Sequence, residues 1–238
     1  MYKQFSFFDY LKPERMNILC ACEESQAVCS AFRDLGHNAF SCDIVDCSGS
    51  HPEWHIKQDV LPLLDGFCSF YTSDGVYHEI NSKWDMIIAF PPCTYLTVSG
   101  NRWFDSSFGA SAVLRHSRRL SAISFFLAFT MADCDHIAIE NPIGIMSTYY
   151  CKPSQIIQPY FFGDPVRKST CLWLKNLPLL VPTKIVEPEL IQLKNGEWDS
   201  LWHYETFALK SSERSLIRSK TFPGIAHAMA DQWGCVFF

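Results

Sequence analysis

Two side chains that could do chemistry follow apolar segments of the sequence. Cys93 comes after the run DMIIAF and two prolines, and Glu140 closes the apolar part of IAIENP. Both segments have the composition of buried strands, and both run into proline, which lacks a backbone N–H and stops sheet pairing. A thiol on a stiff loop could act as a nucleophile, and a carboxyl group in a cleft could act as the accompanying acid.

Each residue also has a purely structural interpretation. A free cysteine is most often buried and inert, so Cys93 could be an ordinary thiol beside a proline loop. Glu140 could cap a helix or pair with a nearby arginine. The functional interpretation gains weight because both residues stand at the expected carboxyl ends of strands, where open α/β sheets bind their ligands.

The segments that must position these residues predict a doubly wound α/β sheet. MNILCA at 16–21 and AFSCDIV at 39–45 are expected strands, and the residues between them have helical spacing with a stop at Gly36. This β-α-β unit opens a doubly wound fold. Further strands are expected at 55–60, 84–90, 136–141 and 170–180, and helices at 111–132 and 223–234.

The bulk composition limits the possible functions. The 238 residues suit one α/β domain with a small appendage, and 48% hydrophobic residues can build a full core. The net charge of −5 argues against a broad surface for duplex DNA, so any nucleic-acid contact must be local or the substrate small. The apolar run at 121–132 is too short to span a bilayer, and no membrane association is expected.

The cysteines favour a reduced protein over a disulfide framework. There are eleven at irregular spacings, and the N-terminus lacks the pattern of a signal peptide, so we expect a cytoplasmic location. One set could bind zinc: Cys42, Cys47, His51 and His55. We predict no metal site, because Cys42 lies in an expected strand and the middle spacing is shorter than in a zinc finger.

The order of the motifs resembles that of the cytosine-C5 DNA methyltransferases. FPPCTYLTVSG looks like their Pro-Cys loop, and IAIENP resembles their Glu-Asn strand end. The segments at 163–174 and 220–230 match their basic strand region and C-terminal motif. The match spans nearly the whole chain and is most similar to small phage and prophage members. It implies a doubly wound, Rossmann-like, S-adenosylmethionine-dependent methyltransferase fold in a bacterial or phage-infected cell.

The resemblance assigns catalytic roles to the two strand ends. Cys93 would add to C6 of cytosine, so that C5 can attack the methyl group of S-adenosylmethionine. Glu140 would protonate or hydrogen-bond N3, which requires a raised pKa, while Cys93 would need a lowered pKa or a nearby base. Asn141 would hold the loop that carries Pro92 and Cys93.

The resemblance also implies a cofactor site. Asp43 matches the acidic residue that grips the ribose hydroxyls, and Asp59 matches the carboxylate near the adenine amino group. Arg167 or Lys168 matches the basic position that contacts cytosine O2 or its backbone. The residues expected around S-adenosylmethionine are Cys22, Glu23, Glu24, Ser25, Asp43, Ile44, Asp59, Val60 and Pro91.

Two features depart from the family. The first loop reads ACEES at 21–25, where the family has a glycine-rich turn, so the usual means of close backbone approach is missing. Glu23, Glu24 and Ser25 could instead cap the following helix or bind the amino group of the cofactor, and capping is favoured for Glu24 or Ser25. Only 178–219 stands in place of a target-recognition domain, so we expect a single domain over 1–238 with a reduced insert.

Two groups of basic residues could contact nucleic acid. Lys210, Arg214 and Arg218 recur every four residues and would share one face if 205–219 is helical. A second group follows the Cys93 loop, together with Tyr95 and Trp103 for base stacking: Arg102, Arg115, Arg118 and Arg119. Solvated helix faces with salt bridges are the alternative for both groups.

Three hypotheses follow for the function. The first is methyl transfer to C5 of cytosine in DNA. The second is the same chemistry on a free or single-stranded pyrimidine nucleotide, which the missing recognition domain suggests. The third is a non-catalytic binding protein on a methyltransferase scaffold, which the glycine-free first loop supports.

Overall fold

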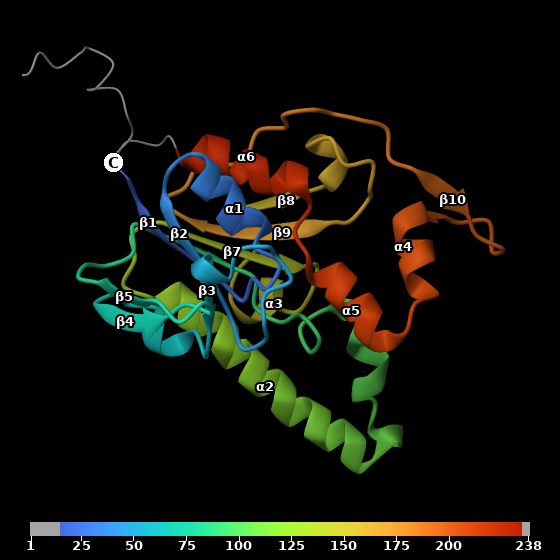
Figure 1. The fold of residues 1–238 in the computed structure, drawn as a ribbon. Coiled ribbons are helices and arrows are strands. Elements are labelled where there is room, and N and C mark those ends of the chain that lie inside the picture. The colour runs from blue at the N-terminus through green and yellow to red at the C-terminus, as the bar shows by residue number, and fades with distance from the viewer. Residues whose placement is uncertain (1–14, 235–238) are drawn as a thin grey trace, which may run out of the picture.

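A seven-stranded sheet forms the centre of the molecule in the computed structural model, which describes residues 15–234. The strand order is β3-β2-β1-β6-β7-β9-β8 (Figure 1). The strands are β1 Asn17–Ala21, β2 Asn38–Asp43, β3 His55–Lys57, β6 Met86–Ala89, β7 Ile137–Pro142, β8 Gln155–Ile157 and β9 Thr170–Lys175.

The direction of the strands defines a doubly wound fold. Strands β1, β2, β3, β6 and β7 are parallel, and β9 runs antiparallel to both of its neighbours, β7 and β8. The strand order reverses between β1 and β6, and ligands of such sheets bind beyond the carboxyl ends of the strands at this reversal. The predicted doubly wound, Rossmann-like α/β fold is therefore confirmed.

Helices cover both faces of the sheet (Figure 1). Helices α1 (Ala27–Asp34) and α6 (Pro223–Trp233) pack against one face, where Phe32 and Trp233 join a core with Ile18. The long helix α2 (Ala110–Met131) covers the other face and packs around Leu19. Because side chains alternate along β1, neighbouring residues Ile18 and Leu19 enter opposite cores.

The expected elements are present with shifted ends. The helices expected at 111–132 and 223–234 correspond to α2 and α6, and α1 is followed by Gly36 in a left-handed conformation. The strand expected at 170–180 ends at Lys175, because Asn176 has a positive φ of 52° and leaves the extended conformation. The strand expected at 55–60 is shorter and ends at Lys57.

Several elements were not expected. Strands β4 (Cys68–Tyr71) and β5 (Tyr77–Ile80) form an antiparallel hairpin outside the main sheet. An Asp74-Gly75 turn between aromatic residues is the sequence signal that could have revealed it, and Gly75 has the positive φ that such a turn needs. The short strand β8 and helix α3 (Met146–Tyr149) carry no comparable signal.

The segment 178–219 forms a small appendage beside the sheet (Figure 1). It contains the hairpin of β10 (Leu190–Gln192) and β11 (Trp198–Ser200), then helices α4 (Leu201–Phe207) and α5 (Ser211–Ser219). The continuous helix considered for 205–219 is wrong, since the chain leaves the helical conformation between α4 and α5. The division into a single domain with a reduced insert stays a prediction.

No helix of residues 15–234 combines the length and the apolar character that crossing a membrane requires.

Candidate functional site

The loop with Cys93 and the end of β7 leave the sheet side by side. Ala89 of β6 stands opposite Ile139 of β7 in a parallel register, so both chains emerge at the same edge. The buried Asn141 then joins the two, because its Nδ2 donates a 2.7 Å hydrogen bond to the Pro91 carbonyl. This contact fixes the start of the proline loop relative to Glu140.

The thiol of Cys93 lies in the field of two charged side chains. Cys93 is exposed over part of its surface, yet the surrounding protein raises its pKa; Glu140 raises it further, and Lys168 opposes the rise. The lowered pKa, one of the two alternatives expected for Cys93 beside a nearby base, is therefore not found. The physical reason is that desolvation and a neighbouring carboxylate both disfavour the thiolate, and they outweigh the single ammonium group.

Glu140 has the raised pKa that its expected role requires. Burial raises the pKa of the carboxyl group, while Lys168 and a hydrogen bond from Thr170 favour the charged form. Since burial is the largest of these effects, the carboxyl holds a proton to a higher pH than an exposed glutamate does.

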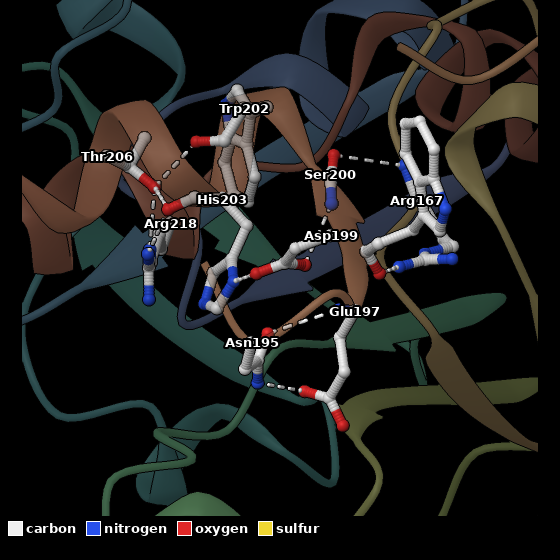
Figure 2. A network of polar contacts seen from close by, with 10 residues as sticks. Arg167, Asn195, Glu197, Asp199, Ser200, Trp202, His203, Thr206 and Arg218 are labelled. Atoms are coloured by element: carbon white, nitrogen blue, oxygen red, sulfur yellow. Dashed lines mark hydrogen bonds and ion pairs between the residues drawn. The ribbon is translucent and has the colours of Figure 1, made fainter. Parts of the chain in front are cut away.

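The structure separates the two candidate basic residues, Arg167 and Lys168. The Arg167 side chain is exposed and donates to the Trp198 carbonyl (Figure 2). Lys168 is half-buried, and its Nζ donates a 3.0 Å hydrogen bond to the Arg218 carbonyl. Only Lys168 of the two acts electrostatically on both Cys93 and Glu140.

The appendage is tied to this basic segment by a polar network (Figure 2). Asp199 accepts a 2.6 Å hydrogen bond from His203, and Arg218 donates to Thr206 and to the His203 carbonyl. The Trp202 ring centroid lies 5.8 Å from the Lys168 Nζ. The network therefore holds α4 and α5 of the appendage against Lys168, the residue that acts on both Cys93 and Glu140.

A cavity of about 510 Å³ opens beside the proline loop. It brings together residues that were expected near the cofactor: Cys22, Asp43, Ile44, Asp59 and Val60, with Pro92 rather than Pro91 from the loop. Glu23, Glu24 and Ser25 do not line it. Tyr95, which was expected to stack on a base, also lines this cavity. Sequence reasoning missed the α2 residues Ala122 and Phe125, because nothing local marks them as neighbours of β2.

The cavity combines two carboxylates with apolar walls. Asp43 accepts hydrogen bonds from the Ile44 and Val45 backbone N–H groups, and burial raises its pKa. Asp59 accepts from the Leu61 N–H at 3.1 Å. The Ile44 side chain is 73% exposed although it lines the cavity, so a flat apolar ring placed there would cover it. These residues fit a nucleoside with hydroxyl and amino donors.

The glycine-free first loop turns through non-glycine residues in the left-handed region. Cys22 has φ of 59° and Gln26 has φ of 60°. Between them, the buried Glu23 carboxylate accepts hydrogen bonds from Val28 N at 2.6 Å and Cys29 N at 3.1 Å, at the start of α1. Burial raises the pKa of Glu23 to about 7, against the effect of these hydrogen bonds.

Of the three residues expected as possible caps of α1, the structure selects Glu23, so the preference for Glu24 or Ser25 is wrong. Glu23 satisfies the free N–H groups of the helix, instead of Glu24 or Ser25. The Glu24 carboxylate accepts from Ser48 N at 3.2 Å, and Ser25 reaches Ala27 N only at 3.5 Å. The positive φ of Gln26 turns the chain so that the side chain three residues earlier covers the helix end.

The basic residues after Cys93 pack around the loop 94–104. Arg119 donates to the Tyr95 carbonyl at 3.0 Å, and its guanidinium lies 3.2 Å from the Phe104 ring centroid. Arg115 lies over the rings of Tyr95 and Phe104, and Arg102 lies over the ring that follows it in the sequence. Contacts within the protein thus explain the positions of Arg102, Arg115 and Arg119 without a nucleic acid.

The second basic group does not share one helical face, because its residues fall on either side of the helix start. Lys210 precedes α5, while Arg214 donates to the Phe207 carbonyl and Arg218 donates to residues of α4. The expected common face is therefore wrong. Arg214 and Arg218 hold α5 against α4.

The tetrad considered for zinc is engaged in other contacts. The two ring nitrogens of His55 lie 2.9 Å from the Ser41 hydroxyl and from the Val45 carbonyl, and His51 contacts Glu53. Within residues 15–234, no three His, Cys, Asp or Glu side chains stand together as metal ligands would. The cysteines of the same range are free thiols.

No family model matches the chain, and no curated protein matches it. Among solved structures, it is similar to one from E. coli described as a DNA modification methyltransferase encoded within a prophage, with 15% sequence identity and a TM-score of 0.41. The alignment covers 72% of this chain and 52% of that one, so the chain spans about half the length of that structure. The function is therefore inferred from the geometry of the site.

Proposed function

We propose that this protein transfers a methyl group from S-adenosylmethionine to C5 of cytosine in DNA. One observation carries the proposal: Cys93 and Glu140 lie at the carboxyl ends of the adjacent parallel strands β6 and β7, next to the reversal of strand order between β1 and β6, and Lys168 acts on both. A nucleophile, an acid and a cation at one sheet edge are the groups that this reaction requires.

The first step joins Cys93 to the base. The Sγ thiolate forms a bond to C6 of cytosine, and the electron pair of the C5–C6 double bond moves toward C5. Protonated Glu140 gives its proton to N3, so that negative charge does not build up on the ring. The raised pKa of Glu140 keeps that proton available at higher pH than an ordinary carboxyl would.

The second step releases the enzyme. When bound, S-adenosylmethionine supplies an electrophilic methyl group, to which C5 bonds as the methyl–sulfur bond breaks. Water takes the C5 proton, the Sγ–C6 bond breaks, and the N3 proton returns to Glu140. Asn141 maintains the position of the loop through both steps by its contact with the Pro91 carbonyl.

The cavity beside the loop would hold the cofactor. Asp43 and Asp59 would accept hydrogen bonds from hydroxyl and amino groups, and Ile44 with Phe125 would enclose the flat ring. Cys22 lines the same cavity from the first loop.

A second candidate is the same chemistry on a free or single-stranded pyrimidine nucleotide. The net charge of −5 and the small appendage favour it, because both limit the contact with duplex DNA. A binding protein without turnover is the third candidate.

Transfer of a labelled methyl group from S-adenosylmethionine tests the proposal. Duplex DNA, single-stranded DNA, RNA and free cytidine nucleotides are offered in parallel to the wild type, to Cys93→Ala and to Cys151→Ala. Cys151 is an exposed free thiol and serves as the matched control. We expect label on DNA, lost in Cys93→Ala and retained in Cys151→Ala. Label on nucleotides alone would favour the second candidate, and none on any substrate the third.

A further inference from the structure

A second cavity, of about 350 Å³, lies between the loop after Cys93 and the first half of α2. Trp103 and Phe108 line it on the loop side, and Arg115 lines it on the helix. Tyr95 and Arg118 line both this cavity and the cofactor cavity, so the two adjoin. The methyl-transfer mechanism makes no use of it.

Aromatic side chains in this cavity are open to solvent. Trp103 is 42% exposed and Phe108 is 43% exposed, and both rings line the same cavity. Their ring centroids lie 5.2 Å apart at an interplanar angle of 55°, which leaves them unstacked on each other. Every nucleobase has a flat face that can stack on such a ring, so the cavity suits a base that has left its own stack.

The charge around the cavity is unbalanced. Among the described residues, neither Arg102, Arg115 nor Arg118 forms an ion pair with a carboxylate. The Arg115 Nε is buried without a hydrogen-bond partner, and Arg118 donates at 3.0 Å to the neutral Tyr95 hydroxyl. In a chain of net charge −5, a local excess of guanidinium groups beside open rings is the combination that phosphates and bases recognise.

We propose that this cavity binds one unstacked base of a single-stranded DNA substrate, with Arg115 and Arg118 at the neighbouring phosphates. A base inside a duplex has both faces covered, so these rings can accept only a base outside one. Tyr95 follows Cys93 by two residues, a span of at most about 7 Å, and a stacked nucleotide step is about 3.4 Å. The bound base is therefore a near neighbour of the target cytosine, and this identification of the target rests on the proposed function.

Fluorescence anisotropy with a labelled single-stranded oligodeoxynucleotide that contains one cytosine tests the proposal, without cofactor. The blunt duplex of the same sequence is the competitor. We expect the single strand to bind more tightly than the duplex. Trp103→Ala should weaken its binding by roughly fivefold to 150-fold, the effect of losing one stacked base, and Trp103→Phe should retain most of the affinity.

The arginine is tested by the dependence of binding on salt. Arg118→Gln should lower the slope of log K against log salt concentration by about 0.7 for each phosphate contact that is lost. This variant also carries the test if Trp103→Ala lowers the melting temperature. The matched controls are Tyr71→Ala, an aromatic residue that is 65% exposed on the β4–β5 hairpin, and Lys83→Ala, an exposed cation before β6 at the opposite edge of the sheet. Neither should change the affinity.

Unchanged affinity in Trp103→Ala, or equal affinity for duplex and single strand, would overturn the proposal. The outcome separates this proposal from the proposed function, because the binding assay needs no methyl transfer. Binding that depends on Trp103, with no label transferred to any substrate, would keep the base-binding cavity and remove the methyltransferase. Methyl transfer by the wild type, together with normal DNA binding by Trp103→Ala, would keep the methyltransferase and remove the base-binding cavity.

Discussion

The loops after β1 and β6 leave neighbouring parallel strands at the same edge, yet they obtain their conformations by different means. After β6, Pro91 and Pro92 restrict the backbone themselves, and Asn141 adds one hydrogen bond. After β1, Cys22 adopts a left-handed conformation that costs roughly 1 kcal/mol or more, and tertiary packing must hold it there.

The ionisable groups of the two loops also differ in their exposure and in their contacts. Cys93 is exposed on its loop, with Glu140 and Lys168 acting on it. Glu23 is buried under α1, where its carboxylate satisfies two backbone N–H groups. One loop therefore presents an exposed thiol, while the other uses a buried carboxyl group to hold its own conformation. A glycine-free sequence after β1 is thus compatible with a sharp turn beside the cavity.

The largest expected effect is on the rate of methyl transfer at the edge that carries Cys93 and Glu140. Glu140→Gln should slow methyl transfer by about 100-fold to 10,000-fold, because an amide cannot supply the N3 proton. Initial rates with labelled cofactor measure this, and Glu79→Gln, an exposed carboxyl group on β5, is the matched control. A loss below about tenfold, or roughly 1.4 kcal/mol of barrier, would contradict the role of Glu140.

The pH dependence of kcat/KM tests the same proton-transfer role of Glu140 together with Cys93. The active form has a Cys93 thiolate and a protonated Glu140, and both pKa values are raised. Between the two pKa values the pair holds one proton, so the rate should be flat. It should fall below the Glu140 pKa, which burial raises above that of an ordinary glutamate, and again above the Cys93 pKa, which burial raises above that of an ordinary thiol. A rate that climbs steadily through pH 10 would exclude this proton pair.

The first loop should respond to pH through stability. The Glu23 pKa is about 7 in the folded protein, whereas an ordinary glutamate has a pKa near 4.3. The folded state therefore binds the proton more tightly, and the free energy of unfolding should fall as pH rises from about 4.3 through about 7, by up to roughly 4 kcal/mol.

Glu23→Gln should remove this loss, which urea titrations of both proteins at pH 5 and pH 8 measure. Relative to the wild type, the variant should be more stable at pH 8 than at pH 5. Glu79→Gln again serves as the exposed control. A stability difference between wild type and Glu23→Gln that does not change with pH would show that burial of Glu23 has no such cost.

The smallest expected effect tests the left-handed turn. Cys22→Gly and Cys22→Ala both delete the thiol, but only glycine adopts φ of 59° without strain. Cys22→Gly should therefore be more stable than Cys22→Ala by about 1 kcal/mol, the reverse of the usual order. Thermal unfolding of the two variants measures this difference in stability. An alanine variant of equal or greater stability would argue against strain at this position.

The sequence by itself determined the elements around the candidate site. Apolar runs predicted β1, β6 and β7, prolines predicted where β6 and β7 end, and the parallel arrangement then placed Cys93 and Glu140 at one edge. These features are local, because proline acts on its own φ and the alternation of side chains decides which face is buried. The roles expected for Asn141, Asp43 and Asp59 came instead from the resemblance to the cytosine-C5 methyltransferases.

Only the tertiary structure decided the properties that depend on distant residues. It brought Lys168 rather than Arg167 into the field of Cys93 and Glu140, raised the Cys93 pKa, and selected Glu23 among the three possible caps of α1. It also formed two adjoining cavities by bringing α2 against the loop after β6. Burial and electrostatic fields arise from side chains that meet only when the chain is folded, so no local pattern of residues could specify them.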